Sequence, residues 1–281
     1  MTTSTIGRGA PRFALRANRP GSAGASVSAG AAGLQPRPWV QRLRRALREE
    51  LFELHYQPIL ELESGLISHH EALVRLADEP GGRLLAPGAF LPAAERHGLV
   101  RELDRLVVRR VAELLGSDSP AAPARVALNL SALSVTDRDM LAHIERELQR
   151  HAVDPRRLVL EITETAAISS VARARAFCAG AEALGCAIAL DDFGVGFGSF
   201  YYAKRLPFSF LKIDGDFVHA LTESRDDRLV VSAIADVARG MGRRTIAEFV
   251  GDEATLQLVH ELGVDHAQGF HVGRPAALGE A

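Results

Sequence analysis

One repeating unit dominates the chain after about residue 52: a short apolar strand, a polar turn, an amphipathic helix and a glycine precede the next strand. Gly185, Gly242 and Gly263 each follow the apolar end of a helical run, where a left-handed helix stop favours glycine. Strands that are apolar nearly throughout are buried on both faces, which is typical of parallel sheet covered by helices. The pattern predicts strands at Phe52–Leu60, Leu66–Leu73, Val126–Leu130, Leu158–Ile162, Ala187–Leu190, Phe210–Ile213, Thr245–Phe249 and, more weakly, His266–Phe270.

The first two of these strands are joined by only the short stretch from Glu61 to Gly65. Such a connection is a hairpin, so one of the eight strands is expected to run antiparallel. Helices are predicted between the other strands, for example over Asp137–Arg150 and Asp226–Arg239, and over Trp39–Leu54 near the start. The predicted fold is α/β, a modified TIM-type (β/α)8 barrel with one antiparallel strand. A doubly wound open sheet is the alternative.

Residues 1–37 are rich in Gly, Ala, Ser, Pro and Arg and lack apolar periodicity, which predicts a flexible N-terminal arm before a barrel domain at 38–281. An organelle transit peptide, a mis-annotated start or a plain linker would have the same composition. Nine arginines precede the first acidic residue, Glu49. Taking them from the 33 basic residues leaves 24 against 35 acidic ones, so the remainder carries about −11. A net-acidic body is a poor surface for duplex nucleic acid.

The cysteines and the hydropathy indicate the cellular setting. Cys178 and Cys186 are too few for a secreted disulfide framework. The sequence has no run of eighteen apolar residues, so no membrane span is expected. A reducing, cytoplasmic location is the prediction.

Polar side chains stand at nearly the same depth on seven successive predicted strands, toward their carboxyl ends, where barrels of this type carry their chemistry. They are Glu71, Asn129, Glu161, Asp191 with Asp192, Lys212, Glu248 and Gln268. Each alone has a simpler interpretation as a turn cap, a solvated acid or a snorkelling lysine. Together, however, several carboxylates in one dry site would repel each other unless a cation holds them. Hard oxygen ligands favour Mg²⁺ or Mn²⁺ over zinc.

The stretch from about Leu47 to Pro275 resembles the EAL-domain family in the order and spacing of eight segments. A lone Glu-Ala-Leu tripeptide carries no weight, whereas eight ordered segments over more than two hundred residues are specific. The segments are Tyr56-Gln57-Pro58, Glu71-Ala72-Leu73, Asn129-Leu130-Ser131, Glu161-Ile162-Thr163-Glu164, Asp191-Asp192-Phe193-Gly194, Leu211-Lys212-Ile213-Asp214, Ala247-Glu248, and Gln268-Gly269-Phe270 before Gly273-Arg274-Pro275.

The resemblance implies a phosphodiesterase that hydrolyses cyclic di-GMP to linear pGpG with water activated by two Mg²⁺ or Mn²⁺ ions. It also implies the roles of particular residues, and a homodimer paired through helices near the loop after the fifth strand. The implied metal ligands are Glu71, Asn129, Glu161, Asp191 and Asp192. The implied catalytic residues are Glu71, Lys212, which would orient the attacking hydroxide, and Glu248. The implied substrate contacts are Gln57, Arg75, Asp214 and Gln268, and Glu164 would anchor the loop after the fifth strand.

Three segments depart from the family's usual residues. Phe197-Gly198-Ser199 replaces Tyr-Ser-Ser, Phe249-Val250-Gly251 replaces Gly-Val-Glu after the Glu, and Gly215 replaces a frequent arginine. Gly198 and Gly251 motivate an alternative in which a weak or inactive EAL domain serves as a cyclic di-GMP receptor or a protein-interaction module. A barrel glycosidase using Glu161 and Glu248 is a third hypothesis. Aromatic residues are only 6% of the chain, and its one tryptophan, Trp39, lies outside the barrel, which disfavours a sugar site.

Overall fold

The computed structural model describes residues 36–163, 166, 170–194 and 203–279. The arm predicted at residues 1–37 therefore lies, except for its last two residues, outside the described part of the chain. Pro36 opens helix α1 (Pro36–Arg48). The helix predicted over Trp39–Leu54 is wrong in its last turn, because Glu50 adopts a positive φ of 55° and Phe52 begins the first strand.

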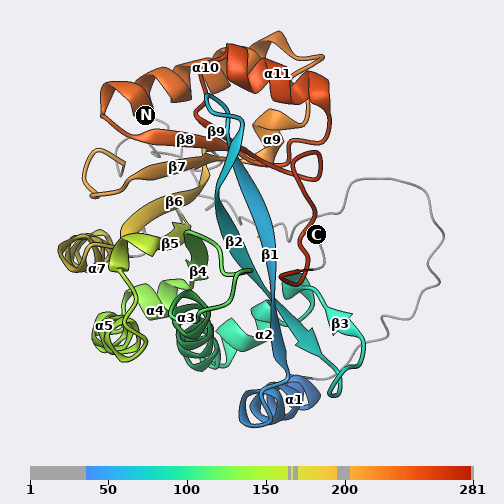
Figure 1. Ribbon diagram of the computed structural model, residues 1–281, viewed down its shortest axis with the longest axis vertical. Helices are drawn as coiled ribbons and strands as arrows, with labels where there is room; N and C mark the ends of the chain where they lie inside the picture. Colours follow the sequence, from blue (N-terminus) through green and yellow to red (C-terminus); the bar gives the residue numbers. More distant parts are fainter. Residues whose placement is uncertain (1–35, 164–165, 167–169, 195–202, 280–281) are drawn as a thin grey trace, which may run out of the picture.

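Eight strands close into a barrel (Figure 1). Strand β1 runs antiparallel to both of its neighbours, β2 and β9, and every other neighbouring pair around the barrel is parallel. The two-residue strand β3 (Leu84–Leu85) adds to β2 outside this ring. The predicted barrel with one antiparallel strand is thus confirmed. Its strands are β1 (Phe52–Glu61), β2 (Leu66–Ala77), β4 (Val126–Leu130), β5 (Leu158–Thr163), β6 (Ala187–Phe193), β7 (Phe210–Ile213), β8 (Arg244–Ala247) and β9 (His266–Gln268).

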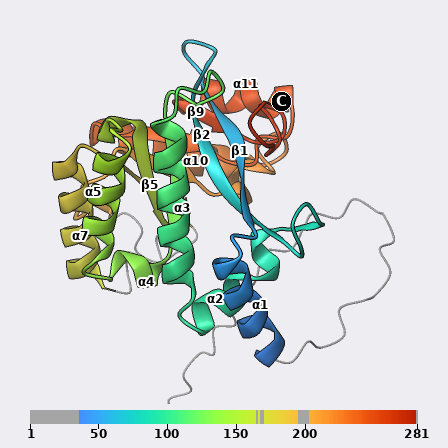
Figure 2. The ribbon, with the colours of Figure 1, turned by 60° about the horizontal axis from the view of Figure 1, so that its bottom comes forward.

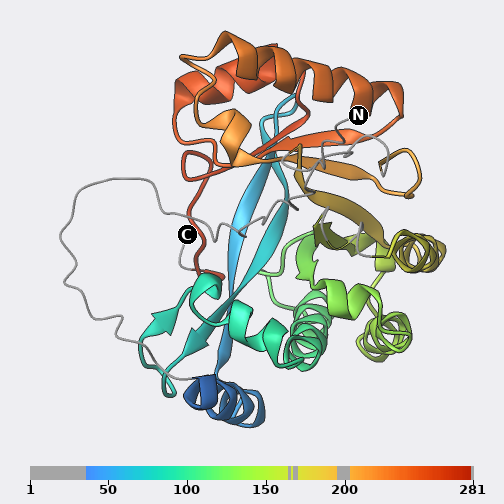
Figure 3. The same ribbon diagram turned by 180° about the vertical axis from the view of Figure 1, so that it is seen from behind.

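Helices cover the outside of the barrel. Figure 2 shows α3, α5 and α7 grouped around β5, and Figures 1 and 3 show α10 and α11 together on the outside of the barrel, beside β8. Gly185, Gly242 and Gly263 have φ values of 101°, 68° and 79°, as the predicted helix stops require. The helices are α2 (Leu91–Arg96), α3 (Val100–Leu115), α4 (Ala132–Val135), α5 (Met140–Arg150), α7 (Val171–Leu184), α9 (Gly215–Val218), α10 (Arg225–Gly240) and α11 (Glu253–Glu261), with 3-10 turns η1 (Pro87–Ala89) and η2 (Pro155–Arg157).

The interior of the barrel is built in two layers, because side chains two residues apart on a strand face the same way. The first layer is mainly apolar and lies toward the amino ends of the parallel strands. The rings of His69, Phe210 and His266 meet across it, with centroids 5.4–6.0 Å apart. Its other members are Ile59, Ala127, Val159, Ala189 and Ile246. This apolar layer closes the barrel at the amino ends of the parallel strands. The polar layer lies on its other side, toward the carboxyl ends of those strands.

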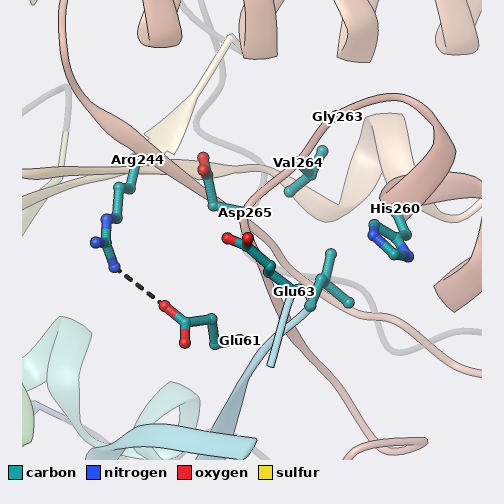
Figure 4. A pocket seen from close by; sticks show the side chains of 8 residues that line it. Glu61, Glu63, Arg244, His260, Gly263, Val264 and Asp265 are labelled. Atoms are coloured by element: carbon teal, nitrogen blue, oxygen red, sulfur yellow. Dashed lines mark hydrogen bonds and ion pairs between the residues drawn. The ribbon is translucent and has the colours of Figure 1, made fainter. Parts of the chain in front are cut away.

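A pocket lies outside that closed end (Figure 4). Its volume is about 380 Å³, and Glu61, Glu63, Arg244, His260 and Asp265 are among its lining residues. Arg244 pairs with Glu61 across it at 3.1 Å. The pocket contains none of the predicted site residues. Among the described helices, none is both long and apolar enough to cross a membrane.

Candidate active site

The second interior layer holds the polar residues, each two positions from a first-layer residue. On each parallel strand the polar residue comes two positions after the first-layer residue, as Glu71 comes after His69. On the antiparallel β1 it comes two positions before, as Gln57 comes before Ile59. Because all eight strands obey this offset, residues far apart in sequence meet at one depth. The layer consists of Gln57, Glu71, Asn129, Glu161, Asp191, Lys212, Glu248 and Gln268.

Lys212 on β7 lies at the centre of this layer and is 1% exposed. Its ammonium nitrogen contacts four carboxylates from four other parts of the barrel. The distances from Nζ are 2.8 Å to Glu161 Oε2, 2.9 Å to Glu248 Oε1, 3.2 Å to Asp191 Oδ1 and 3.4 Å to Glu71 Oε2. One cation therefore faces four acids, which leaves the cluster with surplus negative charge.

Amide side chains complete the layer on the side of β1 and β2. Glu71 accepts hydrogen bonds from Asn129 Nδ2 and from Gln268 Nε2, each at 2.6 Å. Gln268 also donates to Gln57 Oε1 at 3.2 Å, and Gln57 in turn donates to the carbonyl of Gly273 at 3.0 Å. These bonds fix the orientation of Glu71 and tie the layer to the C-terminal segment.

Burial and crowding shift the pKa values of these groups. Burial is the main cause that raises the pKa of Glu161 well above its usual value, and the charge of Glu71 adds to it. Burial likewise raises the pKa of Glu248 to about 8. Burial opposes the ionisation of Glu71, but Lys212 and the two amide donors outweigh it and lower its pKa. For Lys212, burial opposes the charge, and the surrounding carboxylates overcome that and raise its pKa.

The residues fit a hard divalent cation. Asp191, Asp192 and Glu248 each offer a carboxylate oxygen, and these three atoms lie within 4.8 Å of one another. Desolvation, followed by the charge of Asp191, raises the pKa of Asp192 to about 6, so a cation would relieve this repulsion. Glu161 Oε1 is buried without a hydrogen-bond partner. An oxygen in that state is a suitable ligand for Mg²⁺ or Mn²⁺.

Two of the predicted substrate contacts lie at the edge of the layer. Arg75 is half-buried on β2, four residues after Glu71 on the same face, and its Nη1 donates to the carbonyl of Val74 at 3.0 Å. Asp214 follows β7 and caps helix α9, accepting from the amide of Asp216 at 2.7 Å. Glu164 and the stretch around Gly198 lie outside the described residues.

A buried aspartate that the sequence analysis missed anchors the end of β4. Asp104 on α3 is 6% exposed and accepts hydrogen bonds from the amide of Ser131 at 3.0 Å and from its hydroxyl at 2.6 Å. Ser131 comes two residues after Asn129, so Asp104 helps to set the position of that amide. The sequence does mark Asp104, because this acid interrupts the apolar stripe to which Leu103 and Val107 belong on the helix.

The fold and this cluster define a barrel protein with an acidic site, suited to a cation, at the carboxyl ends of its strands. Comparison with known families and proteins is consistent with that class. The family model described as the EAL domain matches residues 40–275. The chain belongs to the EAL-domain family.

Individual relatives show the same likeness. The cyclic di-GMP phosphodiesterase PdeB of Shewanella oneidensis is 37% identical over 85% of this chain, which covers 28% of that protein. The bifunctional diguanylate cyclase/cyclic di-GMP phosphodiesterase MucR of Pseudomonas aeruginosa is 37% identical over 83% of the chain and 34% of the protein. The chain thus spans about a third of the length of these relatives.

Two solved EAL structures match along almost their whole length. The PaMucR phosphodiesterase in complex with c-di-GMP has a TM-score of 0.79 and 35% identity, covering 85% of this chain and 97% of that one. The FimX EAL domain from Pseudomonas aeruginosa bound to c-di-GMP has a TM-score of 0.80 and 27% identity, covering 86% and 98%.

Proposed function

We propose that this protein is a metal-dependent phosphodiesterase that hydrolyses cyclic di-GMP to linear pGpG. The observation that carries the proposal is the meeting of Glu71, Glu161, Asp191 and Glu248 around Lys212 within 3.4 Å of its ammonium nitrogen. The phosphodiesterase names of relatives such as PdeB support the same activity. We also propose a barrel domain at 38–281 preceded by an arm at 1–37; the family match over residues 40–275 supports the extent of the barrel domain.

Two Mg²⁺ or Mn²⁺ ions fit the acidic layer. Glu71, Asn129, Glu161 and Asp191 would hold the first, and Asp191 and Asp192 would hold the second with Glu248 close by. When bound, such a pair neutralises clustered carboxylates and lowers the pKa of a nearby water, which makes it a nucleophile near neutral pH.

The chain's own residues would handle the proton and the substrate. Glu248 has a pKa of about 8, which suits it to accept the proton that the attacking water loses. The Lys212 ammonium would orient the attacking oxygen and offset the charge that develops at phosphorus. Arg75 would grip a phosphate oxygen, since its guanidinium lies on the same strand face as Glu71. Gln57, Asp214 and Gln268 would make further substrate contacts, and Glu164 would anchor the loop after β6.

The test is incubation of the purified full chain with cyclic di-GMP and either Mg²⁺ or Mn²⁺, followed by chromatography of the products. Linear pGpG is expected with the parent chain. Glu71→Gln should abolish turnover, whereas Glu63→Gln, an exposed acid at the opposite end of the barrel, should leave it intact. Absence of pGpG under both metals would overturn the proposal.

The second candidate is a cyclic di-GMP receptor or protein-interaction module with weak turnover or none. It is favoured by Gly251, which stands where the family usually places an acid near the second ion. Binding of cyclic di-GMP by the parent chain without product, together with a Glu71→Gln variant that still binds, would establish this role instead.

We also infer a homodimer in the cytoplasm. Helix α10 exposes Leu229, Val230 and Val237, and Met241 extends this apolar stripe just past its end. Such a stripe is suited to packing against a second copy. Cys178 and Cys186 are both buried and unpaired, as in proteins of reducing compartments. Analytical ultracentrifugation of the parent chain should give a dimer, and Val237→Glu should give a monomer; a monomeric parent would exclude the pairing.

A further inference from the structure

Phe249, the residue after Glu248, has an unfavourable backbone and an exposed side chain. Its φ is 56°, in the left-handed region, which is a genuine outlier for a bulky residue. The residue is 52% exposed, so burial of the ring does little to offset this strain. Glycine would adopt the same backbone without strain. Strained residues persist where the surrounding structure or a function requires them.

A second departure from the family makes room for this ring. A Cβ atom on Gly215 would lie within 2.8 Å of Phe249 Cγ, so a larger residue at position 215 would displace the ring. The ring of His219 holds it from another side, with centroids 5.3 Å apart. Phe249 therefore lies against the first turn of α9, next to Asp214. Gly215 and Phe249 fit together as a pair.

The segment that carries Phe249 is held beside the acidic layer. Glu248 precedes it and contacts Lys212 at 2.9 Å. The amide of Val250 donates to the carbonyl of Gln268 at 3.0 Å, and the amide of His271 donates to the carbonyl of Val250 at 3.1 Å. The residue after Phe249 is thus hydrogen-bonded through its backbone to Gln268, another residue of the polar layer. The exposed ring is fixed at the edge of the site.

We propose that Phe249 is a specificity-determining residue whose exposed ring stacks on a purine base of the substrate. This inference rests on the proposed function and adds which part of the dinucleotide the residue recognises. An exposed aromatic ring beside a phosphate-handling site is the usual platform for a nucleobase, and a purine, with its larger π face, stacks on it more strongly than a pyrimidine does. If the ring served packing alone, it would gain little at a position that is half exposed and favours glycine.

The test compares cyclic di-GMP with its pyrimidine analogue, cyclic di-UMP, which stacks less strongly. Phe249→Gly should raise KM for cyclic di-GMP roughly 5- to 150-fold, the range for loss of one base–aromatic contact, with a smaller change in kcat. The ratio of kcat/KM for cyclic di-GMP to kcat/KM for cyclic di-UMP should fall by roughly five-fold or more in Phe249→Gly. Phe249→Trp, which keeps an aromatic ring, should have the same ratio as the parent chain. Ala152→Gly, which relieves a similar positive φ of 52° at the end of α5, is the matched control and should change neither value.

An unchanged preference in Phe249→Gly would overturn the inference, as would an equal loss with both substrates. If the parent chain hydrolyses neither dinucleotide, the proposed function fails separately. Equilibrium dialysis then decides the inference alone: the ratio of the two dissociation constants must narrow in Phe249→Gly by the same factor, and a constant ratio would refute the stacking role.

Discussion

Replacing Lys212 by methionine removes the one ammonium group that faces the buried acids while keeping a side chain of similar length. The four carboxylates contacted by Nζ at 2.8–3.4 Å would then face each other without that charge. Removing one partner from a buried ion cluster typically costs about 3–5 kcal/mol. For a domain of this size, that loss corresponds to a fall in Tm of roughly 10 °C.

The pH dependence of this loss has a definite sign. Without Lys212, the pKa values of Glu161 and Glu248 rise further above their unfolded values, and Glu71 loses the main charge that lowers its pKa, so the folded state binds more protons. Stability of the variant then falls as pH rises from about 4.5 through about 8 and beyond. The deficit relative to the parent chain should therefore be larger at pH 8 than at pH 6.

Thermal unfolding followed by circular dichroism, with and without Mn²⁺, measures both effects. Mn²⁺ should raise the Tm of Lys212→Met more than that of the parent chain, because the cation supplies the missing positive charge. Lys204→Met removes the only other lysine, which is exposed, and serves as the matched control. Equal melting temperatures for Lys212→Met and Lys204→Met at pH 8 would refute the role given to Lys212.

Three further predictions follow from individual contacts. The apparent affinity for Mn²⁺ should increase as pH rises from about 6 to about 8 and level off above that. The reason is that the Glu248 carboxyl, with a pKa of about 8, must lose its proton to help bind a cation. Calorimetry that shows the same affinity across this pH range would contradict the prediction. Asp104→Ala should lower stability by about 1–3 kcal/mol in denaturant unfolding, because the amide and hydroxyl of Ser131 lose their acceptor, while Asp104→Asn should retain most of it. Burial raises the pKa of both Cys178 and Cys186 to about 12, so neither thiol should react with a disulfide reagent at pH 8 in the folded protein. In guanidinium, two thiols should react per chain. A rapid reaction of the folded protein would disprove this prediction.

The strand pattern predicted the barrel because the interior alternates with a period of two. Val159 and Glu161 on β5 show the offset that every strand repeats, and the short link between the first two strands required the antiparallel β1. Element ends were less predictable. Strand β2 continues to Ala77, beyond the predicted Leu73, because its last residues pair with β1 and β3. Such long-range pairing leaves no local signal.

The positions of the polar layer were predictable from the rule that barrels carry chemistry at the carboxyl ends of their strands. The contacts within it were not. Lys212 and Glu71 are 141 residues apart, and their 3.4 Å approach depends on how the barrel closes. Asp214 caps α9 by accepting a hydrogen bond from the amide of Asp216, a local contact that the sequence analysis did not predict. The strain at Phe249 appears only once the backbone is seen, since an exposed phenylalanine has no distinctive pattern in sequence.

A crystal structure of the full chain grown with Mn²⁺, with anomalous scattering recorded at the manganese edge, locates the ions directly. Two peaks should appear, one among Glu71, Asn129, Glu161 and Asp191 and the other beside Asp192 and Glu248. Manganese bound only elsewhere, for example among the acids of the pocket at the closed end of the barrel, would contradict a paired-cation site formed by residues 71 to 248.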